Sequence, residues 1–268
     1  MNIYDIDFGQ LYREHMATAG RPKPAQAWDA RADEMNRTMG ESGYVDAFIA
    51  RMDFTACSSL LDVGCGTGAI ALAAAPRLEQ VIGLDYSPRM LELLAENARA
   101  RGLDNVRPVR RAWEDDWSDI PACDIVVASR STSVMDMADA LARLDAKAKQ
   151  RVYLTSLAGG RFVDPSLYAA IGRTPPPPLP DYIYILNILH GMGIHARLDY
   201  IENDNRLRGA EDFDAFAGKA ASVLGELTPG ERDGLKAWYG ANPERAREGG
   251  APFRWAFVSW NKTHPGRN

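Results

Sequence analysis

Three glycines at alternate positions, Gly64, Gly66 and Gly68, follow a short apolar segment and precede an alanine-rich one. Because glycine has no Cβ, the chain can turn tightly here and a ligand can approach the bare backbone. The free N–H groups at the start of the following helix favour an anionic group. Asp85 ends a second apolar segment about 20 residues further on, where a carboxylate can accept hydrogen bonds from both hydroxyls of a ribose. These residues predict a site for a cofactor that contains a nucleoside.

The elements that must position these residues alternate between strand and helix. We expect strands over 59–63, 81–85, 106–110, 124–129, 151–156, 196–202 and 253–260, and helices over 44–52, 69–75, 88–101, 137–144 and 211–227. Ser87 is a good helix N-cap and Pro88 a good first helical residue, so the helix after Asp85 has a clear start. Such alternation predicts an α/β fold, a parallel sheet with helices on both faces.

Beyond residue 156 the alternation breaks at Gly159-Gly160 and at a run of prolines over 175–178. Four consecutive prolines exclude a helix or a central strand and indicate a stiff connector. We expect the chain to divide into an N-terminal helical cap (1–40), a cofactor-binding core (41–160), a lid insertion (161–195) and a segment that completes the sheet (196–268). The lid would fold over the carboxyl edge of the sheet, where ligands bind in open α/β folds. A connector merely exposed on the surface is the alternative.

Composition limits the partners. The chain has 268 residues and a formal net charge of −5, which argues against nucleic acid as a partner because such binders carry a basic face. The three cysteines are far apart and form no metal-binding spacing, so we expect reduced thiols and no metal site. An acidic N-terminus without an apolar run predicts no signal peptide, and no segment is apolar over the length that spans a bilayer. We therefore expect a cytoplasmic protein without a membrane partner.

The segment Leu61–Gly68 (LDVGCGTG), together with Val81–Leu91 (VIGLDYSPRML), resembles the class I S-adenosylmethionine-dependent methyltransferases. The acid before the first glycine and the third glycine two positions after the second are that family's form of the turn. The resemblance covers roughly residues 28–160. It implies S-adenosylmethionine as cofactor, with S-adenosylhomocysteine as product. It also implies a Rossmann-like, doubly wound, mostly parallel seven-stranded sheet whose last strand is antiparallel.

The resemblance also implies which residues contact the cofactor. The expected contacts are Trp28, Arg31, Asp62, Gly64, Cys65, Gly66, Thr67, Gly68, Asp85, Tyr86, Met90, Ala112, Trp113, Glu114, Ser129 and Arg130. Asp62 would reach the amino group of the methionine part, with a plain helix-cap role as the alternative. Tyr86 would lie against the adenine. Trp28 and Arg31, in a W-D-x-R-A segment that many small-molecule members share, would close the pocket over the methionine and the acceptor.

Two positions depart from or extend the family pattern. Where members commonly carry an acid for the adenine amino group, this chain has Ala112, so Trp113 would offer its backbone N–H and Glu114 or Asp115 would take the amino contact. His190 lies in the expected lid, where a neutral imidazole could remove a proton from the acceptor, although a lone histidine is more often structural. His190 is therefore the candidate catalytic residue.

The sequence predicts a methyltransferase that moves a methyl group by in-line displacement to a small-molecule acceptor whose nucleophilic atom, O, N, S or C, stays open. A nicotinamide-dependent oxidoreductase is one alternative, since Gly64, Gly66 and Ala69 also fit the dinucleotide pattern G-x-G-x-x-A. Against it, the chain has no Tyr-x-x-x-Lys pair. A non-catalytic subunit that binds the cofactor is the other alternative, suggested by Ala112. The oligomeric state stays open, with a homodimer among the options.

Overall fold

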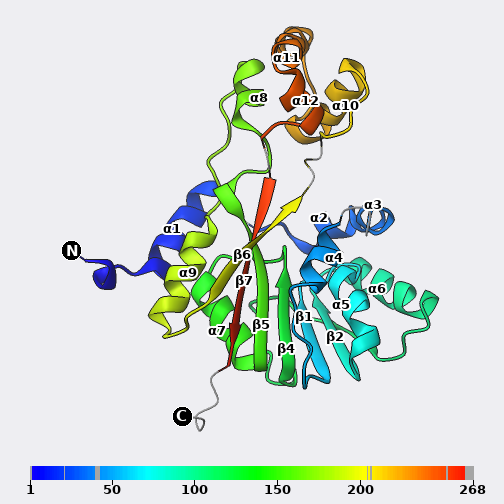
Figure 1. Cartoon of the computed structure of the whole chain (residues 1–268), viewed down its shortest axis with the longest axis vertical. Helices are drawn as coiled ribbons and strands as arrows, with labels where there is room; N and C mark the ends of the chain where they lie inside the picture. Colours follow the sequence, from blue (N-terminus) through cyan, green and yellow to red (C-terminus); the bar gives the residue numbers. More distant parts are fainter. Residues whose placement is uncertain are drawn as a thin grey trace.

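A mixed β-sheet forms the centre of the computed structural model, which describes residues 2–20, 22–39, 43–203, 205, 207–251 and 253–262 (Figure 1). Its strands are β1 (Ser59–Val63), β2 (Gln80–Asp85), β3 (Val106–Arg110), β4 (Cys123–Ser129), β5 (Ala148–Leu157), β6 (Arg197–Asn203) and β7 (Phe253–Asn261). The order across the sheet is β3-β2-β1-β4-β5-β7-β6. Strands β1 to β5 pair in parallel, and β7 runs antiparallel to both of its neighbours. The predicted Rossmann-like sheet with an antiparallel last strand is confirmed.

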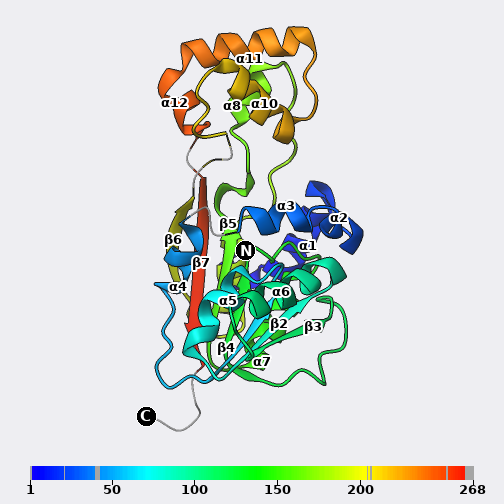
Figure 2. The ribbon, with the colours of Figure 1, turned by 90° about the vertical axis from the view of Figure 1, so that its right-hand side faces the viewer.

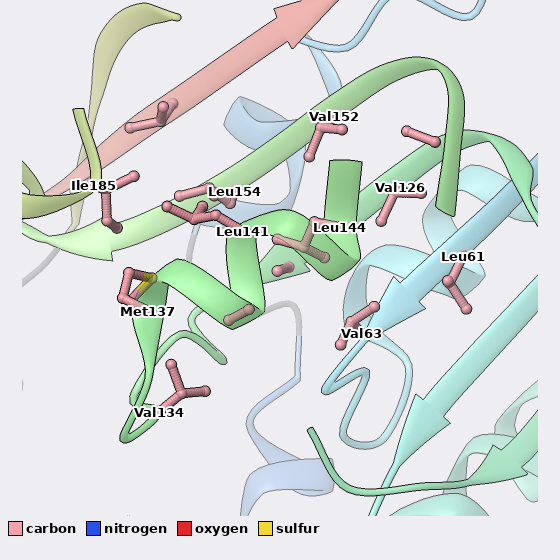
Figure 3. Close-up of a cluster of buried hydrophobic side chains, with 14 of the residues drawn as sticks. Leu61, Val63, Val126, Val134, Met137, Leu141, Leu144, Val152, Leu154 and Ile185 are labelled. Atoms are coloured by element: carbon pink, nitrogen blue, oxygen red, sulfur yellow. The ribbon is translucent and has the colours of Figure 1, made fainter. Parts of the chain in front are cut away.

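Helices cover both faces of this sheet (Figures 1 and 2). One face is covered by α4 (Tyr44–Ile49), α5 (Ala69–Ala74) and α6 (Pro88–Ala100), and the other by α1 (Phe8–Ala19), α7 (Met137–Lys147) and α9 (Tyr182–Gly191). Strand β1 shows how the sequence builds two cores: Leu61 and Val63 pack on the α7 side, whereas Leu60 packs on the α4 side. Figure 3 shows the first of these cores, where Leu141 and Leu144 of α7 lie against the sheet.

The N-terminal segment contributes to both faces of the sheet: its first α-helix packs against α7 and α9, whereas the next two helices lie beside the helix that follows β2. It comprises a short 3-10 helix (Ile3–Asp5), α1, α2 (Ala25–Asp29) and α3 (Ala32–Arg37), and both α2 and α3 pack against α6. Two further 3-10 turns, Ala75–Arg77 and Ala158–Gly160, follow α5 and β5. Within the described part of the chain, none of the helices is long and apolar enough to cross a membrane.

A separate helical lobe stands beyond the carboxyl end of β5 (Figures 1 and 2). It consists of α8 (Pro165–Ala170), α10 (Phe213–Leu224), α11 (Pro229–Ala241) and α12 (Pro243–Glu248). The lobe has a core of its own, in which Leu167 of α8 packs with Phe216 of α10 and Leu235 of α11. Arg173 ties its parts together by donating to both carboxylate oxygens of Glu231 at 2.6 and 2.9 Å.

The structure divides the segment 161–195, which the sequence analysis treated as one lid. Helix α8 belongs to the lobe, whereas α9 packs against α1 and α7 on the body of the protein. Burial explains the division, because α9 is apolar around most of its circumference and buries Ile185 and Leu189 completely. The segment 196–268 divides in the same way: β6 and β7 join the sheet, and α10 to α12 join the lobe.

Candidate active site

The turn after β1 is held by the end of β2. The backbone N–H groups of Gly64 and Cys65 donate to the carbonyl of Leu84 at 2.6 and 3.0 Å. Gly64 and Gly66 have φ values of +69° and +54°, which favour glycine. A Cβ on Gly64 would lie 2.3 Å from the Cβ of Ser131, so the turn after β4 comes directly against this glycine. A Cβ on Gly66 would meet only the sulfur of Met90, at 3.9 Å, so the backbone of Gly66 is open to a ligand.

Asp62 carries an unsatisfied buried atom beside this turn. Its Oδ2 accepts a hydrogen bond from the backbone N–H of Ala71 at 3.1 Å, at the start of α5. Its Oδ1 is buried and has no hydrogen-bond partner among the described residues. Burial raises the pKa of Asp62 to about 7. An orphaned carboxylate oxygen costs free energy unless a ligand brings a donor, and the amino group of the methionine part of the cofactor would be such a donor.

Asp85 lies at the end of β2 and faces the same turn. Its Oδ2 accepts from the N–H of Gly66 and its Oδ1 from the N–H of Ser87, both at 2.9 Å. Burial raises the pKa of this carboxyl group, while the two N–H groups act in the opposite direction. Each carboxylate oxygen can accept a second hydrogen bond, which leaves capacity for two ribose hydroxyls. The orphaned oxygen of Asp62, the open face of Gly66 and this acceptor pair all fit S-adenosylmethionine.

Tyr86 and Trp28 lie together at the side of the site next to α6. The hydroxyl of Tyr86 donates to the carbonyl of Lys23 at 2.7 Å, which ties the N-terminal segment to this side chain. Trp28 packs against Met90 in a small cluster at the start of α6, and the guanidinium of Arg31 lies 5.9 Å from the Trp28 ring centroid. The predicted segment therefore covers the part of the site beside Tyr86. Closure over the methionine and the acceptor stays a prediction.

Asp29 is a site residue that the sequence analysis missed. Its Oδ1 accepts from the hydroxyl of Ser87 at 2.5 Å and from the N–H of Arg89 at 3.2 Å. It thereby caps α6 from a neighbouring helix and docks α2 onto the residue that follows Tyr86. The Ser87-Pro88 helix start was the available signal, since such a start attracts a carboxylate to its free N–H groups.

The turn after β3 separates the two candidates for the adenine amino contact. Asp115 accepts from the N–H of Ala112 at 2.7 Å and so stabilises the turn itself. Glu114 is exposed and lies near Tyr86: burial raises the pKa of that tyrosine, and the charges of Asp85 and Glu114 raise it further. The indole Nε1 of Trp113 donates to the carbonyl of Ser131 at 3.2 Å, so its ring bridges the turns after β3 and β4. This geometry favours Glu114 over Asp115 for the contact.

The turn after β4 is fixed by a buried polar cluster. The Tyr44 hydroxyl lies 2.8 Å from the Oγ of Ser129 and 2.7 Å from the Oγ1 of Thr155. Burial raises the pKa of Tyr44, so it stays a neutral phenol. Thr155 also accepts from the N–H of Arg130 at 3.0 Å. The sequence analysis missed Tyr44 and Thr155, because a tyrosine in a short helix and a threonine in a strand match no motif.

Three other predicted residues have different surroundings. Cys65 is buried in the core and burial raises its pKa well above the usual value, so it packs as an apolar side chain. Thr67 donates to the sulfur of Met39 at 3.4 Å, which ties the glycine turn to the chain after α3. His190 is exposed at the end of α9, with its ring 6.1 Å from Tyr4. Helix α9 packs against α1 and α7, and the role of His190 as a base stays a prediction.

The comparisons with known proteins agree with this geometry. Residues 60–150 match a family described as a methyltransferase domain. An uncharacterised protein of Haemophilus influenzae is 38% identical over 267 residues, which cover 97% of this chain and 98% of that protein.

Two solved structures share the fold at low identity. One is the Haloferax volcanii protein in complex with the Trm112 methyltransferase activator, with a TM-score of 0.58 and 17% identity over 90% of this chain and 97% of that one. The other is coclaurine N-methyltransferase bound to N-methylheliamine and S-adenosylhomocysteine, with a TM-score of 0.54 and 13% identity over 97% of this chain and 96% of that one. These two structures show the shared fold. The match to the methyltransferase-domain family and the near full-length relative, together with the glycine turn and the two carboxylates, place the chain among the class I S-adenosylmethionine-dependent methyltransferases, with S-adenosylmethionine as its cofactor.

Proposed function

We propose that this chain transfers the methyl group of S-adenosylmethionine to a small-molecule acceptor. The observation that carries the proposal is the position of the helical lobe. The chain leaves the sheet after β5, builds α8, and later returns to β7 from α12, so the lobe stands at the carboxyl edge where the cofactor residues lie. An elaboration at this edge suits an acceptor that enters between lobe and sheet. The name of coclaurine N-methyltransferase and its bound N-methylheliamine give a precedent for a small acceptor on this fold.

The residues of this chain would act mainly by holding the cofactor and by orienting it relative to the acceptor. When bound, the cofactor supplies an electrophilic methyl group on a sulfonium centre. The open backbone at Gly66 and the carboxylate of Asp85 would hold the adenosine part. Asp62 would hold the amino group of the methionine part. Transfer then depends on alignment of donor and acceptor in a site that excludes water, and a base is required only for an acceptor that arrives protonated.

The buried cluster around Tyr44 gives this alignment a rigid support. Its hydroxyl joins Ser129 at the end of β4 to Thr155 in β5, and Ser131 donates to the carbonyl of Val63 at 2.6 Å. The turns after β1 and β4 are therefore bonded to each other. Positions held in this way on strands are more precise than positions on free loops.

The proposal is tested with S-adenosylmethionine labelled in the methyl group. We would incubate the protein with a cell extract separated into small-molecule, protein and nucleic-acid fractions. At a cofactor concentration near the wild-type Kd, we expect label in the small-molecule fraction with the wild-type protein and far less with the Asp85→Asn variant, whose cofactor affinity should fall more than tenfold. The exposed Asp104→Asn variant is the matched control and should label as the wild type does. Label in protein or nucleic acid, with none in small molecules, would refute the proposed acceptor class.

A further inference from the structure

Arg130 occupies an unusual backbone position at the end of β4. Its φ is +56°, in the left-handed region that a residue with a long side chain seldom adopts. The hydrogen bond from its N–H to the Oγ1 of Thr155, which is completely buried, holds this conformation. Strained residues of this kind persist where the surrounding structure fixes them, and they concentrate at functional sites.

The side chain of Arg130 is oriented by an aromatic ring. Its guanidinium lies 4.2 Å from the ring centroid of Tyr44, a distance that suits a cation–π contact. The phenol of Tyr44 is itself fixed by its hydrogen bonds to Ser129 and Thr155. A guanidinium placed over a ring can keep its N–H edges for other partners. Among the described residues, the contact of this guanidinium is with the Tyr44 ring, and no carboxylate or carbonyl accepts from its N–H groups.

An aromatic row leads from this arginine toward the lobe. The ring of Tyr44 lies 6.2 Å from that of Trp255 at the start of β7, and Trp255 lies 5.9 Å from Phe162. Phe162 follows the 3-10 turn after β5, where the chain enters the lobe, and its side chain is 45% exposed. Arg130 therefore lies at the inner end of a row whose outer end is an exposed ring.

We propose that Arg130 determines acceptor specificity by pairing with an anionic group of the acceptor, a carboxylate or a phosphate. The inference rests on the proposed function and adds the chemical class of its substrate. A guanidinium held over a ring, with no carboxylate or carbonyl on its N–H groups among the described residues, is suited to bidentate recognition of such groups. An acceptor with an apolar or aromatic part that extends along the aromatic row would also reach Phe162, which lies beyond Tyr44 and Trp255. The carboxylate of the cofactor has the same chemistry, so the test must separate the two sources.

Calorimetry on protein saturated with S-adenosylhomocysteine provides this test. The probes are phenylacetate and phenyl phosphate, with the neutral phenylacetamide for comparison. We expect the wild-type protein to bind an anionic probe about tenfold more tightly than phenylacetamide, the ratio that one charge-assisted pair gives. Arg130→Asn should abolish this preference, because asparagine tolerates the left-handed backbone but lacks the charge. Arg130→Lys should retain part of it, and Arg107→Asn, on the exposed side of β3, should retain all of it.

The affinity for S-adenosylhomocysteine, measured with the same variants, separates the sources. The sequence analysis named Arg130 among the cofactor contacts, whereas the proposal assigns its side chain to the acceptor. We therefore expect this affinity to stay within about twofold of the wild-type value in Arg130→Asn, a difference too small for the loss of an ion pair. The proposal would be overturned if the wild-type protein bound neither phenylacetate nor phenyl phosphate, or bound them no more tightly than phenylacetamide. The proposal would also be overturned if Arg130→Asn still bound the anionic probes more tightly than phenylacetamide. The same holds if this variant lost affinity for S-adenosylhomocysteine while it kept that preference. Failure of the proposed function would appear separately, as absence of methyl transfer to any small molecule.

Discussion

Cofactor binding at acid pH should release a proton from Asp62. Burial raises the pKa of this carboxyl group to about 7, so at pH 6 roughly 90% of the molecules carry the proton. If the cofactor's ammonium group reaches the orphaned Oδ1, the bound state requires the carboxylate. Binding of S-adenosylhomocysteine at pH 6 should therefore release about 0.9 proton, falling to about 0.1 at pH 8. The affinity should fall about tenfold for each pH unit below 7.

The proton count is measured by calorimetry at pH 6 in two buffers that differ in ionisation enthalpy. The difference in observed binding enthalpy divided by the difference in buffer enthalpy gives the number of protons released. Asp62→Asn is the control, since its amide can still accept from Ala71 but has no proton to release. Equal enthalpies in both buffers, or an undiminished release in Asp62→Asn, would refute the contact between Asp62 and the amino group.

The same carboxyl group links folding to pH with a definite sign. Its pKa is higher in the folded chain than in the unfolded chain, so between about pH 4 and pH 7 the folded chain holds a proton that the unfolded chain has lost. The contribution of Asp62 to the free energy of unfolding therefore decreases as the pH rises through this range. Thermal unfolding of the cofactor-free protein should show this slope, and Asp62→Asn should reduce it.

Three further substitutions give distinct outcomes. Asp85→Asn should lower the calorimetric affinity for S-adenosylhomocysteine more than tenfold, because both carboxylate oxygens already accept an N–H and the amide nitrogen would face a donor in either orientation; unchanged affinity would sink the ribose assignment. Gly68→Ala should reduce the free energy of unfolding by about 2–3 kcal/mol, because φ is +98° and the new Cβ would lie 2.4 Å from Leu94 Cδ1. Denaturant titrations measure this change, and an unfolding free energy equal to the wild-type value within error would contradict the close packing of Gly68 against Leu94. Tyr44→Phe should cost about 1–3 kcal/mol, because Thr155 loses a buried partner, and should slow methyl transfer more than it weakens cofactor binding; equal effects on both would argue against a positioning role.

The parts of the site that follow from local sequence were predictable. The glycine turn and the acid at the end of the next strand are fixed by backbone requirements, a positive φ and a close approach, that only particular residue types meet. The strands beside them are apolar and buried on both faces, as the run Ile125–Ala128 shows, so their order along the chain indicates a parallel sheet. The fold and a cofactor that contains a nucleoside could therefore be predicted from the residues themselves, whereas S-adenosylmethionine in particular followed from the resemblance to a known family.

The remaining parts depend on contacts between distant segments. Helix α8 joins α10 and α11 because Leu167, Phe216 and Leu235 bury each other, and no periodicity within one segment reveals that choice. Likewise Asp29 caps α6, a helix far along the chain, through tertiary docking. The position of α9 is another such case: the sequence around His190 did not indicate that this helix packs against α1 and α7, and the catalytic role of His190 stays a prediction.

Determination of the structure with bound S-adenosylhomocysteine tests the central claim most directly. The account predicts the ribose hydroxyls at the carboxylate of Asp85, the adenine beside Tyr86 and the amino group of the homocysteine part at Oδ1 of Asp62. It also predicts that the sulfur of the ligand lies next to the turn after β4, close to Arg130. A ligand bound elsewhere, or one whose ribose does not touch Asp85, would contradict the assignment of this edge as the methyl-transfer site.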